Sequence, residues 1–223
     1  MMNPSKTSIS AVFFDLDGTL LDTAPDMVNA LNYVLQYEDK AILPYEQVRN
    51  TVSHGSAALI NLGFGTQQDI IDFTRRQTRF LDYYAENICV DTVLFTGMEK
   101  VLITLEQAGI YWGIVTNKPE FLTKPLLEAL NLSSRACSVI SGDSLPQRKP
   151  SPEPLYAAAN QCGVLAQECI YVGDAQRDIE AANNAKMFSL LASYGYIDDN
   201  DKLETWQAEA IINTPEAILD YLK

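Results

Sequence analysis

Two aspartates separated by one residue, in Asp15-Leu16-Asp17-Gly18-Thr19, directly follow the apolar run 11–14. The run is typical of a buried strand, so both carboxylates are expected at that strand's carboxyl end. One carboxylate can attack a phosphorus atom while the other transfers protons, and Gly18 favours a turn. The segment predicts a magnesium-dependent phosphate site; the alternative is an Asp-rich turn without chemistry.

Three further polar segments follow predicted strands, at the edge where parallel sheets bind ligands. Thr116 and Asn117 offer a hydroxyl and backbone N–H groups to phosphoryl oxygens. Lys149, in the loop after the next strand, can reach the same phosphate. Asp174 would complete a magnesium shell of oxygen ligands, and Asp178, about one helical turn later, would hold Lys149 or a metal-bound water. Each segment alone is compatible with a helix start or a solvated loop, but their joint order favours the phosphate site.

Short apolar strands alternate with helices, which predicts a Rossmann-like α/β fold: a parallel sheet flanked by helices. The expected strands are 11–15, 111–116, 137–141, 170–174, 187–192 and 210–213. Helices are expected at 98–108, at 120–130, from about 151 to Gly163, and after Asp174.

Residues 22–93 interrupt this alternation, because they contain helical patterns and no convincing strand. A block inserted directly after the Asp15 loop would lie above that loop, so we expect an all-helical lid hinged at 20–22 and 92–95. The core would then comprise residues 1–21 and 94–223. Within the lid, Arg49, His54 and Gly55 are the candidates for substrate contact.

The overall charge restricts the partners. The 223-residue chain carries a formal net charge of −13, which disfavours nucleic acid or an anionic membrane as partner. No signal-peptide core or membrane-crossing apolar run is evident, which favours a cytoplasmic protein. The four cysteines lack close pairs, which predicts neither a zinc site nor a disulfide framework, and Cys137 and Cys169 are expected in the core.

The order of these residues and the inserted helical block resemble the haloacid dehalogenase superfamily of phosphatases. The resemblance implies that Asp15 forms an aspartyl-phosphate and that Asp17 acts first as acid and then as base. It implies a catalytic set of Asp15, Asp17, Thr116 and Lys149 and a phosphate-binding set of Gly18, Thr116, Asn117 and Lys149. Mg²⁺ would be bound by Asp15, Asp174 and, through its backbone carbonyl, Asp17, with Asp178 as a supporting acid.

Other members of the superfamily fit less well. Dehalogenases of this fold lack an acid at the position of Asp17, and phosphonatases need a lid lysine, yet no lysine occurs between Lys40 and Lys100. Sugar-phosphate mutases usually lack the acid placed at Asp178. A phospho-aspartate signalling protein is a further alternative, but such receiver domains are shorter and have no lid.

The substrate is predicted to be a small phosphorylated metabolite. Segments 14–23, 115–119 and 194–196 resemble phosphoglycolate phosphatases, which makes phosphoglycolate the first candidate. The tail, with Gly195-Tyr196-Ile197 and Trp206, also resembles N-acetylmuramic acid 6-phosphate phosphatases. A lid that binds a two-carbon acid should supply one or two cations, whereas a lid for an amino sugar should be roomier and less basic.

Overall fold

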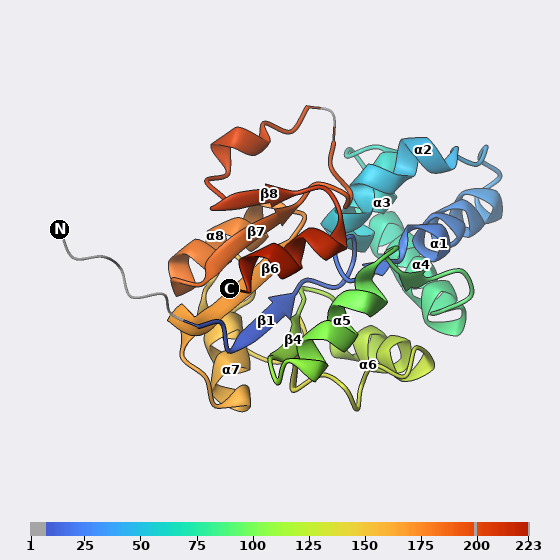
Figure 1. Ribbon diagram of the computed structural model, residues 1–223. Helices are drawn as coiled ribbons and strands as arrows, with labels where there is room; N and C mark the ends of the chain where they lie inside the picture. The colour runs from blue at the N-terminus through green and yellow to red at the C-terminus, as the bar shows by residue number, and fades with distance from the viewer. Residues whose placement is uncertain (1–7, 199, 223) are drawn as a thin grey trace.

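A computed structural model describes residues 8–198 and 200–222. Its main body is a six-stranded parallel sheet in the order β5-β4-β1-β6-β7-β8 (Figure 1). The strands are β1 (Ala11–Phe14), β4 (Tyr111–Val115), β5 (Ser138–Ile140), β6 (Cys169–Gly173), β7 (Phe188–Ala192) and β8 (Ala210–Ile212). The α/β fold class is confirmed, and each strand lies within one residue of its expected ends.

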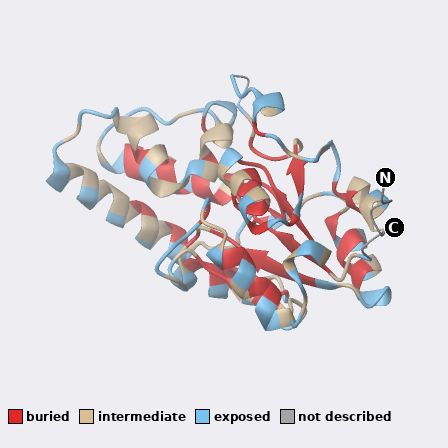
Figure 2. Cartoon of the chain, turned by 90° about the vertical axis from the view of Figure 1, so that its left-hand side faces the viewer, coloured by how far each residue is buried: buried red, intermediate tan, exposed pale blue. Residues whose placement is uncertain are grey.

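Alternate side chains of each central strand point to opposite faces of the sheet. Both faces therefore carry apolar side chains, and helices cover each of them. Val12 and Phe14 of β1 pack into one core with residues of α5 (Met98–Gln107), α6 (Glu120–Ala129) and the 3₁₀ helix η4 (Pro215–Tyr221). Phe13 packs on the opposite face with residues of α7 (Glu153–Cys162) and α8 (Gln176–Ala185). Figure 2 shows the resulting buried sheet between two helical layers. The short 3₁₀ helices η2 (Ala166–Glu168) and η3 (Leu203–Thr205) complete this part.

Residues 24–86 form a separate layer of helices, here called the helical block, at the carboxyl end of β1 (Figure 1). It comprises α1 (Ala24–Tyr37), α2 (Tyr45–Val48), η1 (Arg49–His54), α3 (Gly55–Phe64) and α4 (Ile70–Glu86). The block has its own apolar core, which includes Leu31, Leu59 and Phe80. The two connections to the sheet pair with each other as the antiparallel strands β2 (Leu21–Asp22) and β3 (Val93–Leu94).

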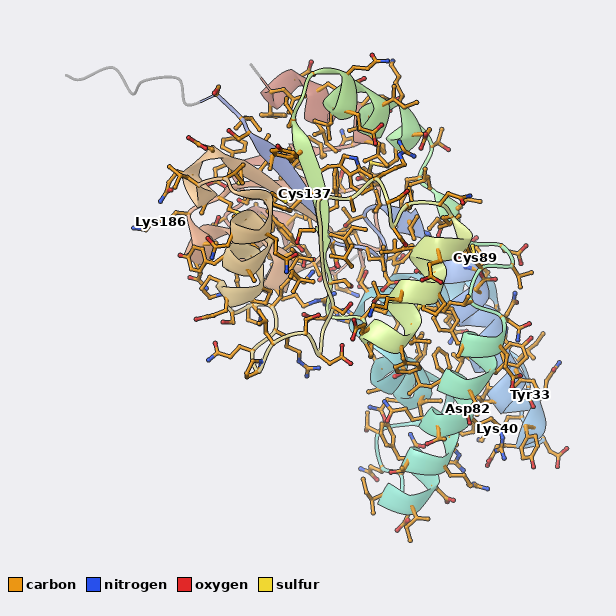
Figure 3. The ribbon with its side chains drawn as sticks, turned by 90° about the horizontal axis from the view of Figure 1, so that it is seen from below. Tyr33, Lys40, Asp82, Cys89, Cys137 and Lys186 are labelled. Atoms are coloured by element: carbon orange, nitrogen blue, oxygen red, sulfur yellow. A yellow bond between two sulfur atoms is a disulfide. The ribbon has the colours of Figure 1, made fainter. Side chains whose placement is uncertain are left out.

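The cysteines correct one expectation from the sequence. Cys137 and Cys162 form a disulfide that joins the start of β5 to the end of α7 (Figure 3). Cys137 is therefore a covalent partner rather than a free core thiol, whereas Cys169 is free and buried as expected. The pairing escaped prediction because the two residues are 25 positions apart and only the packing of α7 against β5 brings them together. In the described part of the chain, no helix has the length and apolar character needed to cross a bilayer.

Candidate active site

The loop after β1 places Asp15 at the carboxyl edge of the sheet. The backbone N–H of Asp15 donates to the Val172 carbonyl at 2.9 Å, which extends the contact of β1 with β6 by one residue. The buried carboxylate accepts a 2.7 Å hydrogen bond from the N–H of Leu16. Gly18 turns the chain with a φ of +83°, and a Cβ at this position would lie 2.1 Å from Oδ2 of Asp174. Only glycine therefore allows the loop to approach Asp174 so closely.

Lys149 lies at the centre of the site with its side chain fully buried. Its Nζ is 2.9 Å from Oδ1 of Asp15 and 2.7 Å from Oδ1 of Asp178. It also donates to the Val115 carbonyl at 2.8 Å and to the hydroxyl of Tyr171 at 2.7 Å. The ammonium group therefore has two hydrogen-bond acceptors and two carboxylate ion-pair partners around its three protons.

Asn117 positions the backbone of Lys149 rather than its ammonium group. The Asn117 amide donates to the Lys149 carbonyl at 3.0 Å and accepts from the Lys149 N–H at 3.1 Å. The peptide bond between Lys149 and Pro150 is cis. Thr116 is buried at the end of β4, and its hydroxyl accepts a 3.1 Å hydrogen bond from the N–H of Lys118. The ends of β4 and β5 are thereby joined beside Asp15.

Three carboxylates converge next to Lys149. Asp15, Asp174 and Asp178 each offer an oxygen, and these oxygens lie within 4.8 Å of one another. Burial and the neighbouring charges of Asp15 and Asp178 raise the pKa of Asp174 to about 7. Burial also raises the pKa of Asp178, with Asp15 adding to the effect. For Asp15, burial is outweighed by Lys149 and Arg177, which hold its pKa below the usual range.

This cluster fits a divalent cation. The donors are buried carboxylate oxygens, the ligands that hard cations such as magnesium prefer. Burial and the charges of Asp15 and Asp178, which raise the pKa of Asp174, disfavour its ionised form. A cation bound here would supply the missing charge.

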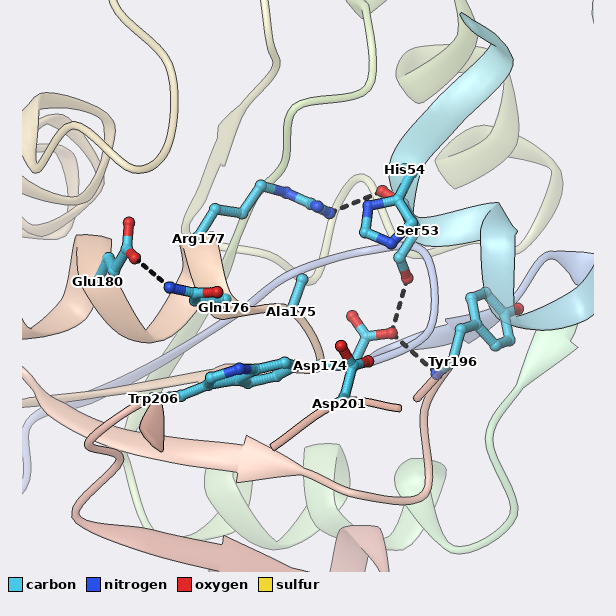
Figure 4. A pocket seen from close by; sticks show the side chains of 10 residues that line it. All are labelled: Ser53, His54, Asp174, Ala175, Gln176, Arg177, Glu180, Tyr196, Asp201 and Trp206. Carbon is cyan, nitrogen blue, oxygen red and sulfur yellow. Dashed lines mark hydrogen bonds between the residues drawn. The ribbon is translucent and has the colours of Figure 1, made fainter. Parts of the chain in front are cut away.

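Asp174 is also where the helical block meets the acidic cluster (Figure 4). Its Oδ2 accepts hydrogen bonds from the Ser53 hydroxyl at 2.7 Å and from the N–H of Tyr196 at 2.9 Å. Arg177 donates to the Ser53 carbonyl at 2.7 Å, and its guanidinium lies 3.9 Å from Asp15. Ser53 in η1 of the helical block therefore contacts both Asp174 and Arg177.

The side chain of Asp17 has different surroundings. Its Oδ1 lies 2.9 Å from Nζ of Lys118 and accepts a 2.7 Å hydrogen bond from Thr23. The same Nζ donates to the hydroxyl of Tyr84 in α4 at 2.9 Å. Burial opposes the charge of Lys118, but Asp17 and Tyr84 raise the pKa of Lys118 above its usual range. The ammonium group of Lys118 thus links Asp17 to the helical block.

Two of these neighbours, Lys118 and Tyr171, were missed by the sequence analysis. Lys118 directly follows Thr116 and Asn117, so its place in the loop after β4 was a usable signal. Tyr171 lies inside β6, where an aromatic residue is indistinguishable from ordinary strand core. Its hydroxyl donates to the Val115 carbonyl at 2.8 Å, a contact between strands that are not neighbours in sequence.

A cavity of about 650 Å³ opens between Asp15, Lys149 and the helical block. His54 and Gly55 line it, and burial together with the charge of Arg177 lowers the pKa of His54. Arg49 is absent from its lining. The guanidinium of Arg49 instead donates to the carbonyls of Gly195 and Tyr194 at 3.0 and 3.3 Å.

The chain is similar to known proteins in sequence. The family profile of haloacid dehalogenase-like hydrolases matches residues 12–192. A phosphoglycolate phosphatase of Xanthomonas campestris pv. campestris (strain 8004) is 44% identical over 209 residues, which cover 92% of each chain. An N-acetylmuramic acid 6-phosphate phosphatase of Pseudomonas aeruginosa is 34% identical over 214 residues, covering 96% of this chain and 95% of that one.

The solved structures agree with the sequence comparisons. The crystal structure of a predicted phosphoglycolate phosphatase from Haemophilus somnus 129PT superposes with a TM-score of 0.86 at 26% identity. The superposition covers 98% of this chain and all of the other. The family profile spans most of the sheet and the whole helical block, so the match includes every residue of the acidic cluster and Lys149. The chain belongs to the haloacid dehalogenase-like hydrolases.

Proposed function

We propose that this phosphoric monoester hydrolase acts on a small phosphorylated metabolite through a phosphorylated Asp15. The observation that carries the proposal is the buried carboxylate of Asp15, whose Oδ1 lies 2.9 Å from Lys149 and whose pKa is lowered by Lys149 and Arg177. A carboxylate that stays ionised in a buried site is available as a nucleophile.

The proposed reaction has two steps. An oxygen of Asp15 attacks phosphorus, the bond to the ester oxygen breaks, and Asp17 gives that oxygen a proton. Water then attacks phosphorus while Asp17 takes its proton, and the bond between Asp15 and phosphorus breaks to release inorganic phosphate. Asp17 suits proton transfer because its side chain lies outside the acidic cluster and faces the helical block.

Positive charge must offset the repulsion between a phosphate dianion and Asp15. We assign the metal site to Asp15, Asp174 and the backbone carbonyl of Asp17, with Mg²⁺ as the cation and Asp178 holding Lys149. Bound Mg²⁺ would stabilise the charge on the phosphoryl oxygens. Lys149, the Thr116 hydroxyl and the N–H group of Asn117 would bind those oxygens from the other sides. Gly18, whose N–H donates to the Leu21 carbonyl at 3.0 Å, would shape the loop beside the phosphate.

We also propose that residues 22–93 are a lid domain on a core of 1–21 and 94–223. The pairing of β2 with β3 supports hinges at 20–22 and 92–95, because the two segments that connect the lid to the core lie side by side there. The contacts of Ser53 with Asp174 and of Tyr84 with Lys118 are bonds that a closed lid would make and an open lid would lack.

The relatives suggest two substrates. Phosphoglycolate is favoured by the higher identity, 44% against 34%, and N-acetylmuramic acid 6-phosphate by the tail around Gly195-Tyr196-Ile197. Turnover of both, with inorganic phosphate measured as product, compares them directly. Release of phosphate also separates hydrolysis from a mutase, which returns the phosphoryl group to a sugar.

A cytoplasmic location is part of this proposal. Disulfides are rare in that compartment, so Cys137 and Cys162 are expected to be reduced in the cell. Alkylation of living cells before lysis tests this, and protection of both cysteines would indicate an oxidising compartment.

The central experiment measures hydrolysis of p-nitrophenyl phosphate with Mg²⁺ and with EDTA. We expect turnover with Mg²⁺, none with EDTA, and none for Asp15→Asn. The matched control is Asp82→Asn, an exposed acid of α4 (Figure 3), which should keep wild-type rates. Borohydride reduction of the reacting enzyme should trap phosphorylation at Asp15. Retained hydrolysis by Asp15→Asn would overturn the assignment of the nucleophile.

A further inference from the structure

The part of the cavity formed by the helical block has a distinct chemistry. Apolar side chains line it from three elements, including Val52 of η1, Phe80 of α4 and Met27 of α1. Leu81 adds to this wall, and Val52 and Phe80 are almost completely buried. An apolar wall this extensive stabilises a leaving group that carries apolar surface.

Besides Ser53 and Tyr84, which are bonded to residues of the core, two uncharged polar side chains interrupt the apolar wall. Gln77 of α4 donates to the hydroxyl of Ser56 in α3 at 3.0 Å, and both residues line the cavity. An amide group has two N–H donors and one carbonyl acceptor. Within residues 8–198 and 200–222, the contact with Ser56 is the one hydrogen bond that the Gln77 side chain makes. Its carbonyl oxygen and second N–H therefore remain available to a ligand.

Charged groups are absent from this wall. Among the described residues, no Lys, Arg, Asp or Glu of the helical block lines the cavity, and Arg49 is bound to the carbonyls of Tyr194 and Gly195. The lowered pKa of His54 favours its neutral form at neutral pH. The cations of the cavity, Lys118, Arg148 and Arg177 besides Lys149, come from the core, so a compact carboxylate would find its partner on that side and would leave the wall of the block uncontacted.

The volume of the cavity also favours a substrate larger than a two-carbon phosphate ester. A two-carbon phosphate ester has about nine non-hydrogen atoms. If each takes roughly 30 Å³, which is the volume of one water molecule in the liquid, the ester fills roughly 270 Å³. The cavity measures about 650 Å³. More than half of it would stay empty around such a substrate, whereas a substituted sugar phosphate would fill it.

We propose that Gln77 and Ser56 determine specificity for a phosphorylated N-acyl amino sugar. The amide of the substrate would hydrogen-bond with Gln77 and Ser56, and its acyl group would pack against Leu81, which is partly exposed to the cavity. This inference rests on the proposed phosphatase activity and names the class of its substrate.

The test compares kcat/KM for N-acetylmuramic acid 6-phosphate, its de-N-acetylated form muramic acid 6-phosphate, and 2-phosphoglycolate. We expect the N-acetylated sugar to exceed each of the others by at least about tenfold, because a site built for a hydrogen-bonding group discriminates strongly against its absence. Equal or higher values for either comparison substrate would overturn the proposal.

Two cavity variants test whether Gln77 and Ser56 cause the preference for the N-acetylated sugar. Gln77→Leu should lower kcat/KM for the N-acetylated sugar about ten- to a hundredfold and reduce its ratio to muramic acid 6-phosphate by a similar factor. Ser56→Ala should reduce the same ratio by a smaller factor, and it provides the test if the Gln77 variant does not fold. Gln36→Leu, the same change on an exposed turn of α1, is the matched control and should leave the ratio unchanged. An unchanged ratio in both cavity variants would refute the role of this pair.

Different results would reject the proposed phosphatase activity and the proposed substrate class. No turnover of p-nitrophenyl phosphate by the wild-type enzyme with Mg²⁺ would reject the phosphatase activity. Turnover of that compound without a preference for the N-acetylated sugar would reject only the substrate class.

Discussion

Replacement of Asp174 by asparagine should stabilise the metal-free protein. Asp174 is buried beside Asp15 and Asp178, and its pKa rises from 3.8 to about 7. A raised pKa means that the fold favours the neutral carboxyl group and opposes its ionisation. Asparagine has a similar shape, stays neutral and keeps an oxygen that can accept the hydrogen bonds from Ser53 and Tyr196.

The size of the effect follows from linkage. The shift is about three pKa units, and each unit corresponds to about 1.4 kcal/mol, so ionised Asp174 costs the fold roughly 4 kcal/mol. Below about pH 4 the group is protonated in both the folded and the unfolded chain, so wild type and variant should be equally stable. Between pH 4 and 7 the unfolded chain ionises first and wild-type stability falls relative to the variant. Above pH 7 the difference should be constant.

Urea unfolding in EDTA, followed from pH 4 to 8.5, measures this difference. We expect Asp174→Asn to gain stability over wild type as pH rises, reaching a plateau of a few kcal/mol near pH 7. Added Mg²⁺ at about a hundred times Kd should narrow the difference by about 2.7 kcal/mol, because it stabilises the wild type and the variant lacks a ligand. Asp82→Asn, an exposed control, should follow wild type throughout. A stability difference that does not change with pH would refute the buried, protonated state of Asp174.

Three further changes probe the same architecture. Lys149→Met should lower kcat for p-nitrophenyl phosphate by at least about 100-fold, since it removes a charge that stabilises the transition state, and wild-type kinetics in this variant would contradict its phosphate-binding role. Gly18→Ala should abolish Mg²⁺-dependent turnover, because its Cβ would overlap the carboxylate of Asp174, whereas Gly109→Ala, also at positive φ but with open space around it, should stay active in the same assay. Reducing the disulfide between Cys137 and Cys162, which closes a loop with a sequence separation of 25, should lower the free energy of unfolding by about 3 kcal/mol, and a melting temperature that does not respond to a reductant would contradict this.

Several features of this chain were predictable because they depend on local sequence. Each strand of the sheet is a short apolar run, and the parallel order follows from helices between the runs. The polar residues that follow the strands, from Asp15 to Asp174, therefore had to meet at one edge of the sheet. Their roles in catalysis stay predictions, but their proximity follows from the topology.

Other features were decided by the tertiary structure alone. Helical spacing shows which residues of a lid share a face, but not which face meets the core. The fold places Gln77 in the cavity and binds Arg49 to the carbonyls of Tyr194 and Gly195, although Arg49 was the candidate by residue type. The contact of Lys118 with Tyr84 likewise joins residues from separate layers. Such contacts depend on how two separately packed cores fit together, and this long-range packing leaves no periodic signal in the sequence.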